Sequence, residues 1–203
     1  MPIPSQTVGL FPEPVSRYTV WSESWKPQLL SVNLEPVDRR HYADNHDYSH
    51  DDRVLDRWPT LNRTILDCCQ QFANEVLGIR DPLRITQSWI NRYRPGEYIH
   101  QHNHPNSLVS ATWYWQLPET AEILFHRHAL NSAHTWTMKF DRHGDSASGF
   151  AAQITSIRVE EGDLLIWPSY LVHSVPAWNH DEPRYSLSLN AMPEHWGSGL
   201  YRV

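Results

Sequence analysis

The chain has 203 residues, of which 40% are hydrophobic and 20% are charged, and its formal net charge is -6. A chain of this length buries one well-formed core but is short for two, so we expect one domain spanning residues 1–203. No run of Lys or Arg forms the basic stripe that a nucleic acid partner requires. No stretch approaches the roughly 20 apolar residues of a membrane span, and the first residues lack the pattern of a signal peptide. We therefore expect a cytoplasmic protein that binds neither nucleic acid nor membrane.

The first fifty residues predict edge structure followed by a loop. Prolines bracket residues 8–10 and 15–20, and both short apolar segments are expected to be extended because proline removes the donors of a central strand. Residues 41–52 are polar and aromatic and fit neither a helix nor a strand. We interpret them as a surface loop, with His46 and His50 as ordinary hydrogen-bonding side chains.

An amphipathic helix is predicted from about residue 54 to 78. Apolar side chains recur there at intervals of three and four, at positions 54, 58, 61, 65, 69, 72 and 76. Pro59 suits the first turn of its main part, and Gly78 is expected to end it. Cys68 and Cys69 are adjacent within this segment, so they predict neither a disulfide framework nor a CxxC metal site.

After the helix the hydrophobic period changes to two. Short strands divided by Pro, Gly, Asp and Asn are predicted near residues 84–94, 97–103, 107–117, 121–128, 153–159, 163–167, 170–176 and 184–191. A helix packed on strands that form two facing sheets is a mostly β fold, the jelly-roll or double-stranded β-helix (cupin-like) barrel. Residues 129–150 interrupt the spacing and predict an insertion that could act as a lid.

Two groups of histidines are candidates for metal ligation. His100, His102 and His104 alternate along one predicted strand, so they are expected to share one face of a sheet. His173 lies in an otherwise apolar segment and therefore needs a polar partner. Fe(II) in oxygenases is held by a facial triad of side chains that leaves adjacent positions open, and two strand ligands plus a distant histidine fit that geometry.

The segment around Arg184 predicts a carboxylate site. Residues 184–190 alternate apolar side chains with a polar face that begins with Arg184 and includes Ser186. A guanidinium and a hydroxyl on one strand face can bind the distal carboxylate of 2-oxoglutarate while its other end chelates the metal. A structural ion pair is the alternative role for Arg184. No acid or base besides the metal ligands is expected to be catalytic.

These motifs resemble a known family. The segments 102–107, 167–173 and 184–190, together with the opening residues 10–15, are similar to the 2-oxoglutarate/Fe(II) oxygenases found in marine bacteria and cyanophage genomes. More distantly, they resemble the prolyl hydroxylase pattern, in which Tyr114 matches the strand tyrosine. The resemblance implies a double-stranded β-helix, Fe(II), 2-oxoglutarate and oxidation of an unactivated C–H bond. It implies His102, His104 and His173 as metal ligands and Arg184, Ser186 and Tyr114 as cosubstrate contacts.

The sequence departs from the wider superfamily at one ligand. His104 stands where the pattern has a carboxylate, and no neighbouring Asp or Glu replaces it. His100 competes with His104 for the role of third ligand. His126 and His128 alternate with apolar residues on the next strand and could line the pocket or face solvent.

Three functions therefore stay open at this point. The first is a 2-oxoglutarate- and Fe(II)-dependent oxygenase acting on a small molecule or an amino-acid-like group. The second is a cupin-like, three-histidine dioxygenase that does not use 2-oxoglutarate, with Arg184 binding the substrate. The third is a non-catalytic jelly-roll module that binds a ligand through its ten Trp residues. A homodimer stays open as the oligomeric state.

Overall fold

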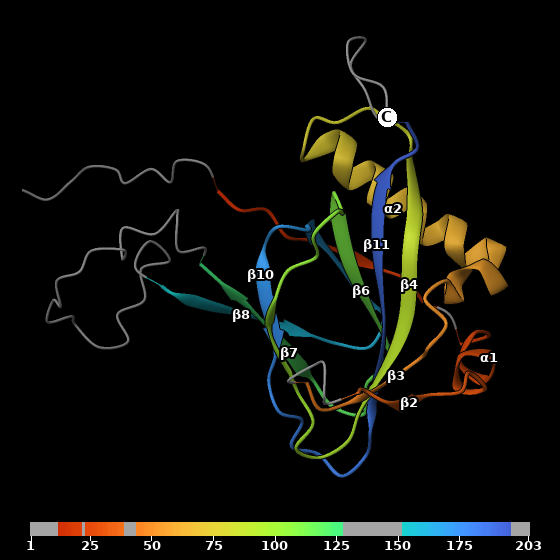
Figure 1. The fold of residues 1–203 in the computed structure, drawn as a ribbon, viewed down its shortest axis with the longest axis vertical. Coiled ribbons are helices and arrows are strands. Elements are labelled where there is room, and N and C mark those ends of the chain that lie inside the picture. Colours follow the sequence, from red (N-terminus) through yellow and green to blue (C-terminus); the bar gives the residue numbers. More distant parts are fainter. Residues whose placement is uncertain (1–11, 22, 39–43, 128–151, 196–203) are drawn as a thin grey trace, which may run out of the picture.

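Two antiparallel β-sheets face each other in the computed structural model, which describes residues 12–21, 23–38, 44–127 and 152–195 (Figure 1). The larger sheet has the order β1-β9-β6-β11-β4-β3-β2, and the smaller has the order β5-β10-β7-β8. The strands are β1 Ser16–Thr19, β2 Glu35–Pro36, β3 Asp47–Tyr48, β4 Leu83–Tyr93, β5 Ile99–His102, β6 Val109–Gln116, β7 Ala121–His126, β8 Ile154–Val159, β9 Asp163–Pro168, β10 Val172–Val175 and β11 Arg184–Pro193. Strands β4 to β11 correspond to the eight predicted segments, which confirms the mostly β, jelly-roll fold.

The N-terminal segments partly follow the prediction. Residues 15–20 contain β1, which pairs with β9 at the edge of the larger sheet as expected, whereas residues 8–10 lie outside the described residues. The short helix α1, Lys26–Leu30, and the two-residue strands β2 and β3 were not predicted, because segments this short carry little hydrophobic period.

The prediction of a surface loop for residues 41–52 is wrong for the part that the structure describes. β3 pairs with β4, and both His46 and Asp47 are buried. The cause is electrostatic, because the Asp47 carboxylate accepts hydrogen bonds from Arg92 and forms a 2.8 Å ion pair with Arg94. Arg92 lies in β4 and Arg94 follows directly after the strand, and these two side chains bind residues 44–50 to the sheet. We call this ion-pair cluster the Asp47 clamp.

The predicted helix begins with a short 3-10 turn. This turn, Val54–Arg57, is followed by α2, Pro59–Glu75, and Trp58 between them has a non-helical φ of -130°. Pro59 occupies the first turn, where its missing N–H leaves no hydrogen bond unmade. Gly78 has a φ of +71°, the left-handed conformation that ends many helices. Val76 is exposed, contrary to the pattern, because it follows the last residue of α2.

Two hydrophobic cores lie on opposite faces of the larger sheet. The first fills the space between α2 and the sheet, and includes Phe72 of the helix and Trp113 and Leu187 of the strands. The second lies between the two sheets and includes Tyr114 and Trp167. Strand alternation divides β6 and β11 between these environments, so one face of each packs on the helix and the other faces the smaller sheet.

The polar residues of β11 point between the sheets beside the second core. There, the side chains of Arg184, Ser186, Ser188 and Asn190 line a cavity. The residues that alternate with them, at positions 185, 187, 189 and 191, pack toward α2. Within the described part of the chain, no helix is long and apolar enough to cross a membrane. The predicted lid, residues 129–150, lies outside the described residues.

Candidate active site

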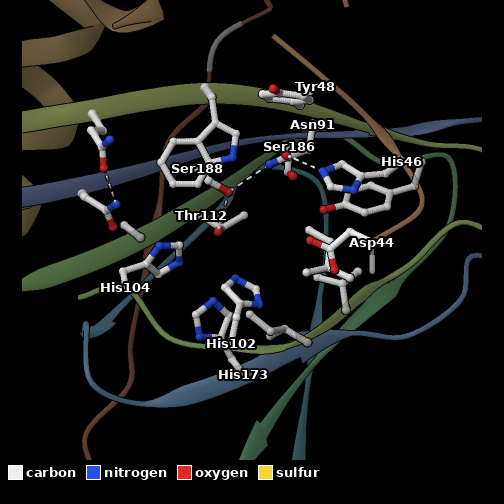
Figure 2. Close-up of a pocket in the computed structure, with 18 of the residues that line it drawn as sticks. Asp44, His46, Tyr48, Asn91, His102, His104, Thr112, His173, Ser186 and Ser188 are labelled. Carbon is white, nitrogen blue, oxygen red and sulfur yellow. Dashed lines mark hydrogen bonds between the residues drawn. The ribbon is translucent and has the colours of Figure 1, made fainter. Parts of the chain in front are cut away.

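Three histidines meet between the two sheets. His102 ends β5 and is the Cα partner of His173 in β10, and His104 follows two residues later, after the strand has ended. Their candidate ligand nitrogens all lie within 4.8 Å of one another. The ring centroid of His102 is 4.3 Å from that of His173 and 5.1 Å from that of His104. Figure 2 shows the three rings converging at one side of the cavity.

His100 does not join this cluster, although the sequence places it on the same face of an ideal strand. Between the paired positions His102↔His173 and Ile99↔Val175, β5 has one residue more than β10. Such a bulge reverses the alternation, so Ile99 lines the cavity together with His102. The His100 ring instead packs edge-on against Tyr98, at 4.9 Å between centroids. The prediction that three alternating histidines share one face is therefore wrong.

Backbone carbonyls fix which nitrogen two of these rings offer. Nδ1 of His102 lies 2.8 Å from the carbonyl oxygen of His100, and Nδ1 of His173 lies 2.9 Å from that of Leu171. A carbonyl can only accept, so each Nδ1 carries the proton and donates. The Nε2 atom of each ring is left with a free lone pair, which is the tautomer that metal-ligating histidines adopt.

Burial keeps His104 and His173 uncharged at neutral pH. It lowers the pKa of His104 to about 4, with a further contribution from His102, and it holds the pKa of His173 well below its ordinary value. The indole of Trp167 packs edge-on against His173, at 4.9 Å between centroids, and contributes to this burial. Neutral imidazoles with free lone pairs are the form that binds a metal, so the residues present fit a metal ion.

Carboxylates are absent from the three-histidine cluster among the residues that the structure describes. Asp44 and Asp52 line the same cavity without joining it. The structure thus places His104, rather than an acid, at the third position of the cluster, as the sequence pattern indicates.

Arg184 lines the same cavity from the larger sheet. The cavity has a volume of about 580 Å³ and is lined by both sheets. Arg184 is 2% exposed, and its Nε and Nη2 atoms have no hydrogen-bond partner among the described residues. The guanidinium carbon lies 4.4 Å from the ring centroid of Tyr93 and 5.1 Å from that of Trp178. Burial lowers its pKa. A buried guanidinium without a carboxylate is costly, so the residues present fit an anionic ligand.

The other predicted cosubstrate contacts also lie in the cavity wall. Ser186 follows on the same face of β11, and Tyr114 of β6 is 4% exposed. Burial raises the pKa of the Tyr114 phenol, so it stays a hydrogen-bond donor at neutral pH. Tyr93 and Trp178, whose rings lie beside the guanidinium, were not predicted as site residues. Their signal in the sequence is only that of core aromatics.

A row of hydrogen-bonded polar side chains forms the floor of the cavity. His46 Nε2 lies 3.2 Å from Asn91 Oδ1, the Asn91 amide donates to Ser188 Oγ at 3.1 Å, and Thr112 Oγ1 lies 3.1 Å from the same oxygen (Figure 2). Sequence analysis did not select His46 or Asn91. Asn91 carries a detectable signal, because it is a polar residue on the inward face of a buried strand.

The remaining histidines have other positions. His126 lies half-buried at the end of β7, where its Nε2 is 2.7 Å from Ser174 Oγ, and it does not line the cavity. His50 lies at the edge of the cavity and is exposed, with its Nε2 3.0 Å from Glu35 Oε2, so its interpretation as an ordinary hydrogen-bonding side chain is confirmed. The surface position expected for His46 is wrong, because His46 is buried. His128 lies outside the described residues.

Comparison with protein families gives one match. The family described as "Putative 2OG-Fe(II) oxygenase" matches residues 87–190, which contain all three clustered histidines and Arg184. No curated protein matches the chain.

Solved structures share the fold at low sequence identity. An oxidoreductase of the 2OG-Fe(II) oxygenase family from Burkholderia pseudomallei is 13% identical, with a TM-score of 0.62 over 92% of this chain and 88% of that one. HygX from Streptomyces hygroscopicus, solved with nickel, 2-oxoglutarate and hygromycin B bound, is 15% identical, with a TM-score of 0.61 over 90% and 84%. The α-ketoglutarate-dependent epimerase SnoN from nogalamycin biosynthesis is 14% identical, with a TM-score of 0.60 over 90% and 80%.

Proposed function

This chain belongs to the 2OG-Fe(II) oxygenase family, and on that premise we propose that it oxidises an unactivated C–H bond of a small molecule, most simply by hydroxylation. The observation that carries the proposal is a single cavity that contains both three converging histidines and a buried guanidinium, two nitrogens of which have no hydrogen-bond partner among the described residues. The first fits Fe(II) and the second fits the distal carboxylate of 2-oxoglutarate.

The metal would be held by His102, His104 and His173. Their rings come from two strands of the smaller sheet and from the segment after β5, and they converge at one side of the cavity, which is the arrangement that a facial site requires. The backbone carbonyls that accept from His102 and His173 fix the orientation of both rings before a metal binds. Fe(II) with 2-oxoglutarate supplies the oxidising chemistry when bound, by activating dioxygen.

The larger sheet would hold the cosubstrate. Arg184 offers two N–H groups that have no partner among the described residues, in a fork that matches a carboxylate, and its guanidinium carbon lies over the rings of Tyr93 and Trp178. Ser186 and Tyr114 line the cavity near it and are the candidate hydroxyl donors. Because Arg184 is 2% exposed, little water competes for its hydrogen bonds.

The outcome of the oxidation and the substrate are parts of this proposal that the fold does not determine. One structural neighbour is named as an epimerase and another was solved with hygromycin B, so this fold supports more than one outcome and accepts small molecules. A small molecule or an amino-acid-like group suits the cavity, of which the polar floor described above is one wall.

Anaerobic titration tests the proposal. Addition of Fe(II) and then 2-oxoglutarate to the protein should produce the weak visible charge-transfer band of a chelated Fe(II)–2-oxoglutarate complex. The His173→Ala protein is the matched control and should give no band, because one anchor of the metal is removed. A parent protein that binds Fe(II) but gives no band with 2-oxoglutarate would contradict the cosubstrate assignment.

Both alternative functions lose support. A three-histidine dioxygenase without 2-oxoglutarate is favoured only by His104 in place of a carboxylate, whereas the family is one of 2-oxoglutarate enzymes. A non-catalytic binding module is disfavoured because the family that matches residues 87–190 is one of oxygenases.

A further inference from the structure

The charges that line the cavity are unbalanced toward the negative. Among the described lining residues, the charged side chains are the carboxylates of Asp44 and Asp52 and the guanidinium of Arg184, and no lysine is present. If the proposed function holds, the metal dication and the 2-oxoglutarate dianion cancel, and Arg184 offsets one carboxylate. One negative charge is left over in this count, and because Asp52 is exposed to solvent, the carboxylate that lacks an ion-pair partner inside the cavity among the described residues is that of Asp44. A substrate that carries a positive charge would neutralise it.

Asp44 is the less exposed of the two carboxylates, and a hydrogen bond connects it to the strand that carries His102. The segment that carries it is fixed by two backbone hydrogen bonds between Asn45 and Tyr98, of 3.0 and 3.1 Å. Its Oδ1 accepts the backbone N–H of His100 at 2.9 Å, two residues before the candidate ligand His102. No described Lys or Arg forms an ion pair with it. Asp52, in contrast, is exposed.

His46 supplies a second acceptor on the same side. The Asn91 amide nitrogen donates to Ser188, so its Oδ1 faces His46 and accepts from Nε2–H. The Nδ1 atom of His46 is therefore an unprotonated acceptor. It is buried in a side chain that is 7% exposed, and it has no hydrogen-bond partner among the described residues. A buried acceptor without a donor indicates that a bound group supplies one.

Aromatic rings complete this part of the cavity. The ring of His46 stacks on that of Tyr93, with 5.2 Å between centroids and 14° between planes, and the ring of Tyr48 lies 6.3 Å from that of His46 and also lines the cavity. Figure 2 shows Asp44 and His46 together on one side of the cavity, across from His104. Aromatic faces and carboxylates both attract organic cations.

We propose that this corner, formed by Asp44 and His46, binds a primary ammonium group of the substrate, so that the enzyme oxidises an amine-bearing small molecule. This proposal rests on the proposed oxygenase function. An ammonium has three donors and no acceptor, which matches a carboxylate oxygen and a bare imidazole nitrogen. A neutral alcohol would satisfy the acceptor but leave the carboxylate charge unpaired, and a carboxylate substrate would be repelled.

Paired probes test the ammonium site without turnover. The protein is loaded with Zn(II) and 2-oxoglutarate, and ligand-observed NMR measures the dissociation constants of primary amines (amino acids, polyamines and aminosugars) and of their N-acetylated counterparts. Acetylation removes the charge and keeps the carbon skeleton. The amine of at least one pair should bind about tenfold more tightly or better than its acetylated form.

Two variants test whether Asp44 is responsible for the preference for amines. Asp44→Asn should weaken amine binding about tenfold or more and leave the acetylated probes unchanged. Asp67→Asn makes the same change of net charge on the outer face of α2, where Asp67 pairs with Arg63, and should change neither.

Several results would overturn the proposal. They are equal binding of the amine and its acetylated form, failure of every amine to bind at millimolar concentration, unchanged amine binding in Asp44→Asn, and loss of metal from that variant, which would make Asp44 a metal ligand. The charge-transfer titration on the parent protein separates this failure from that of the oxygenase function. If the parent protein gives the charge-transfer band but does not prefer amines over their acetylated forms, only the proposed substrate class is refuted.

Discussion

Replacement of Arg184 by Ala is the most direct perturbation of the proposed cosubstrate site. The side chain is 2% exposed, and its Nε and Nη2 atoms have no hydrogen-bond partner among the described residues, so no described protein group competes with a carboxylate for these two N–H groups. Arg184→Lys keeps a charge but loses both the planar fork and the stacking between Tyr93 and Trp178. The pair of variants therefore separates charge from geometry.

The expected magnitude follows from burial. Truncation of one partner of a buried, hydrogen-bonded charge pair costs about 2 to 5 kcal/mol, which is about 30-fold or more in affinity for 2-oxoglutarate. Arg184→Lys should recover part of that loss, and Ser186→Ala should cost only about 1 kcal/mol, as for one neutral hydrogen bond. In the absence of 2-oxoglutarate, Arg184→Ala should not show the large instability of a broken ion pair, because no described carboxylate pairs with the guanidinium.

Calorimetric titration of the metal-loaded proteins with 2-oxoglutarate measures these affinities, and thermal unfolding with and without 2-oxoglutarate provides an independent reading. The parent should gain about 2.7 kcal/mol of stability at a ligand concentration of 100 times Kd, and Arg184→Ala should gain much less at that concentration. Arg63→Ala, an exposed residue of α2, is the control. Equal 2-oxoglutarate affinity in Arg184→Ala and the parent would refute the assignment.

Three further predictions concern the histidines. His102→Ala and His173→Ala should each lose most of the bound iron by metal analysis, since only two anchors remain in each variant; full iron content in both would remove the proposed centre. His104→Asp should retain iron and His100→Ala should be mild, because the bulge in β5 turns His100 out of the cluster; iron lost only from the His100 variant would show that the solution register differs. The metal-free protein should become less stable as the pH falls. Burial lowers the pKa of His104 and of His46 to about 4, so the unfolded chain, with an ordinary value near 6.5, takes up protons first. The stability present above pH 6.5 is lost as the pH falls toward 4, by about 2 kcal/mol for each group at pH 5. Urea unfolding at pH 7 and pH 5 measures this loss, and an unchanged unfolding free energy would contradict the burial of these two rings.

Periodicity in the sequence predicted the fold well. Eight strands and the helix were located within a few residues, because each has one face in a hydrophobic core and the other in a different environment. The elements that were missed, such as β2 and β3, are held by pairing and by the Asp47 clamp rather than by an apolar pattern. A contact between Asp47 and Arg92, 45 residues apart, leaves no local signal.

The candidate site was only partly predictable. The cluster of His102, His104 and His173 follows from the motifs, but the exclusion of His100 depends on one extra residue in β5, which strand periodicity cannot detect. His46 was dismissed because a lone histidine in a polar segment is usually at the surface. Its burial comes from the pairing of β3 with β4, which is a property of the tertiary structure.

The two faces of the larger sheet have different tasks, since one packs against the helix and the other lines the cavity. Its outer face builds the helix core, with Phe72 and Leu187 at 0% exposure, and its inner face carries the polar floor with Asn91, Ser188 and Thr112. Because neighbouring residues of one strand serve opposite faces, a substitution on the floor can change what the cavity recognises without touching the packing on α2. Related chains could therefore diverge in substrate while sharing one scaffold, and libraries that vary only the floor residues should retain a high fraction of folded members.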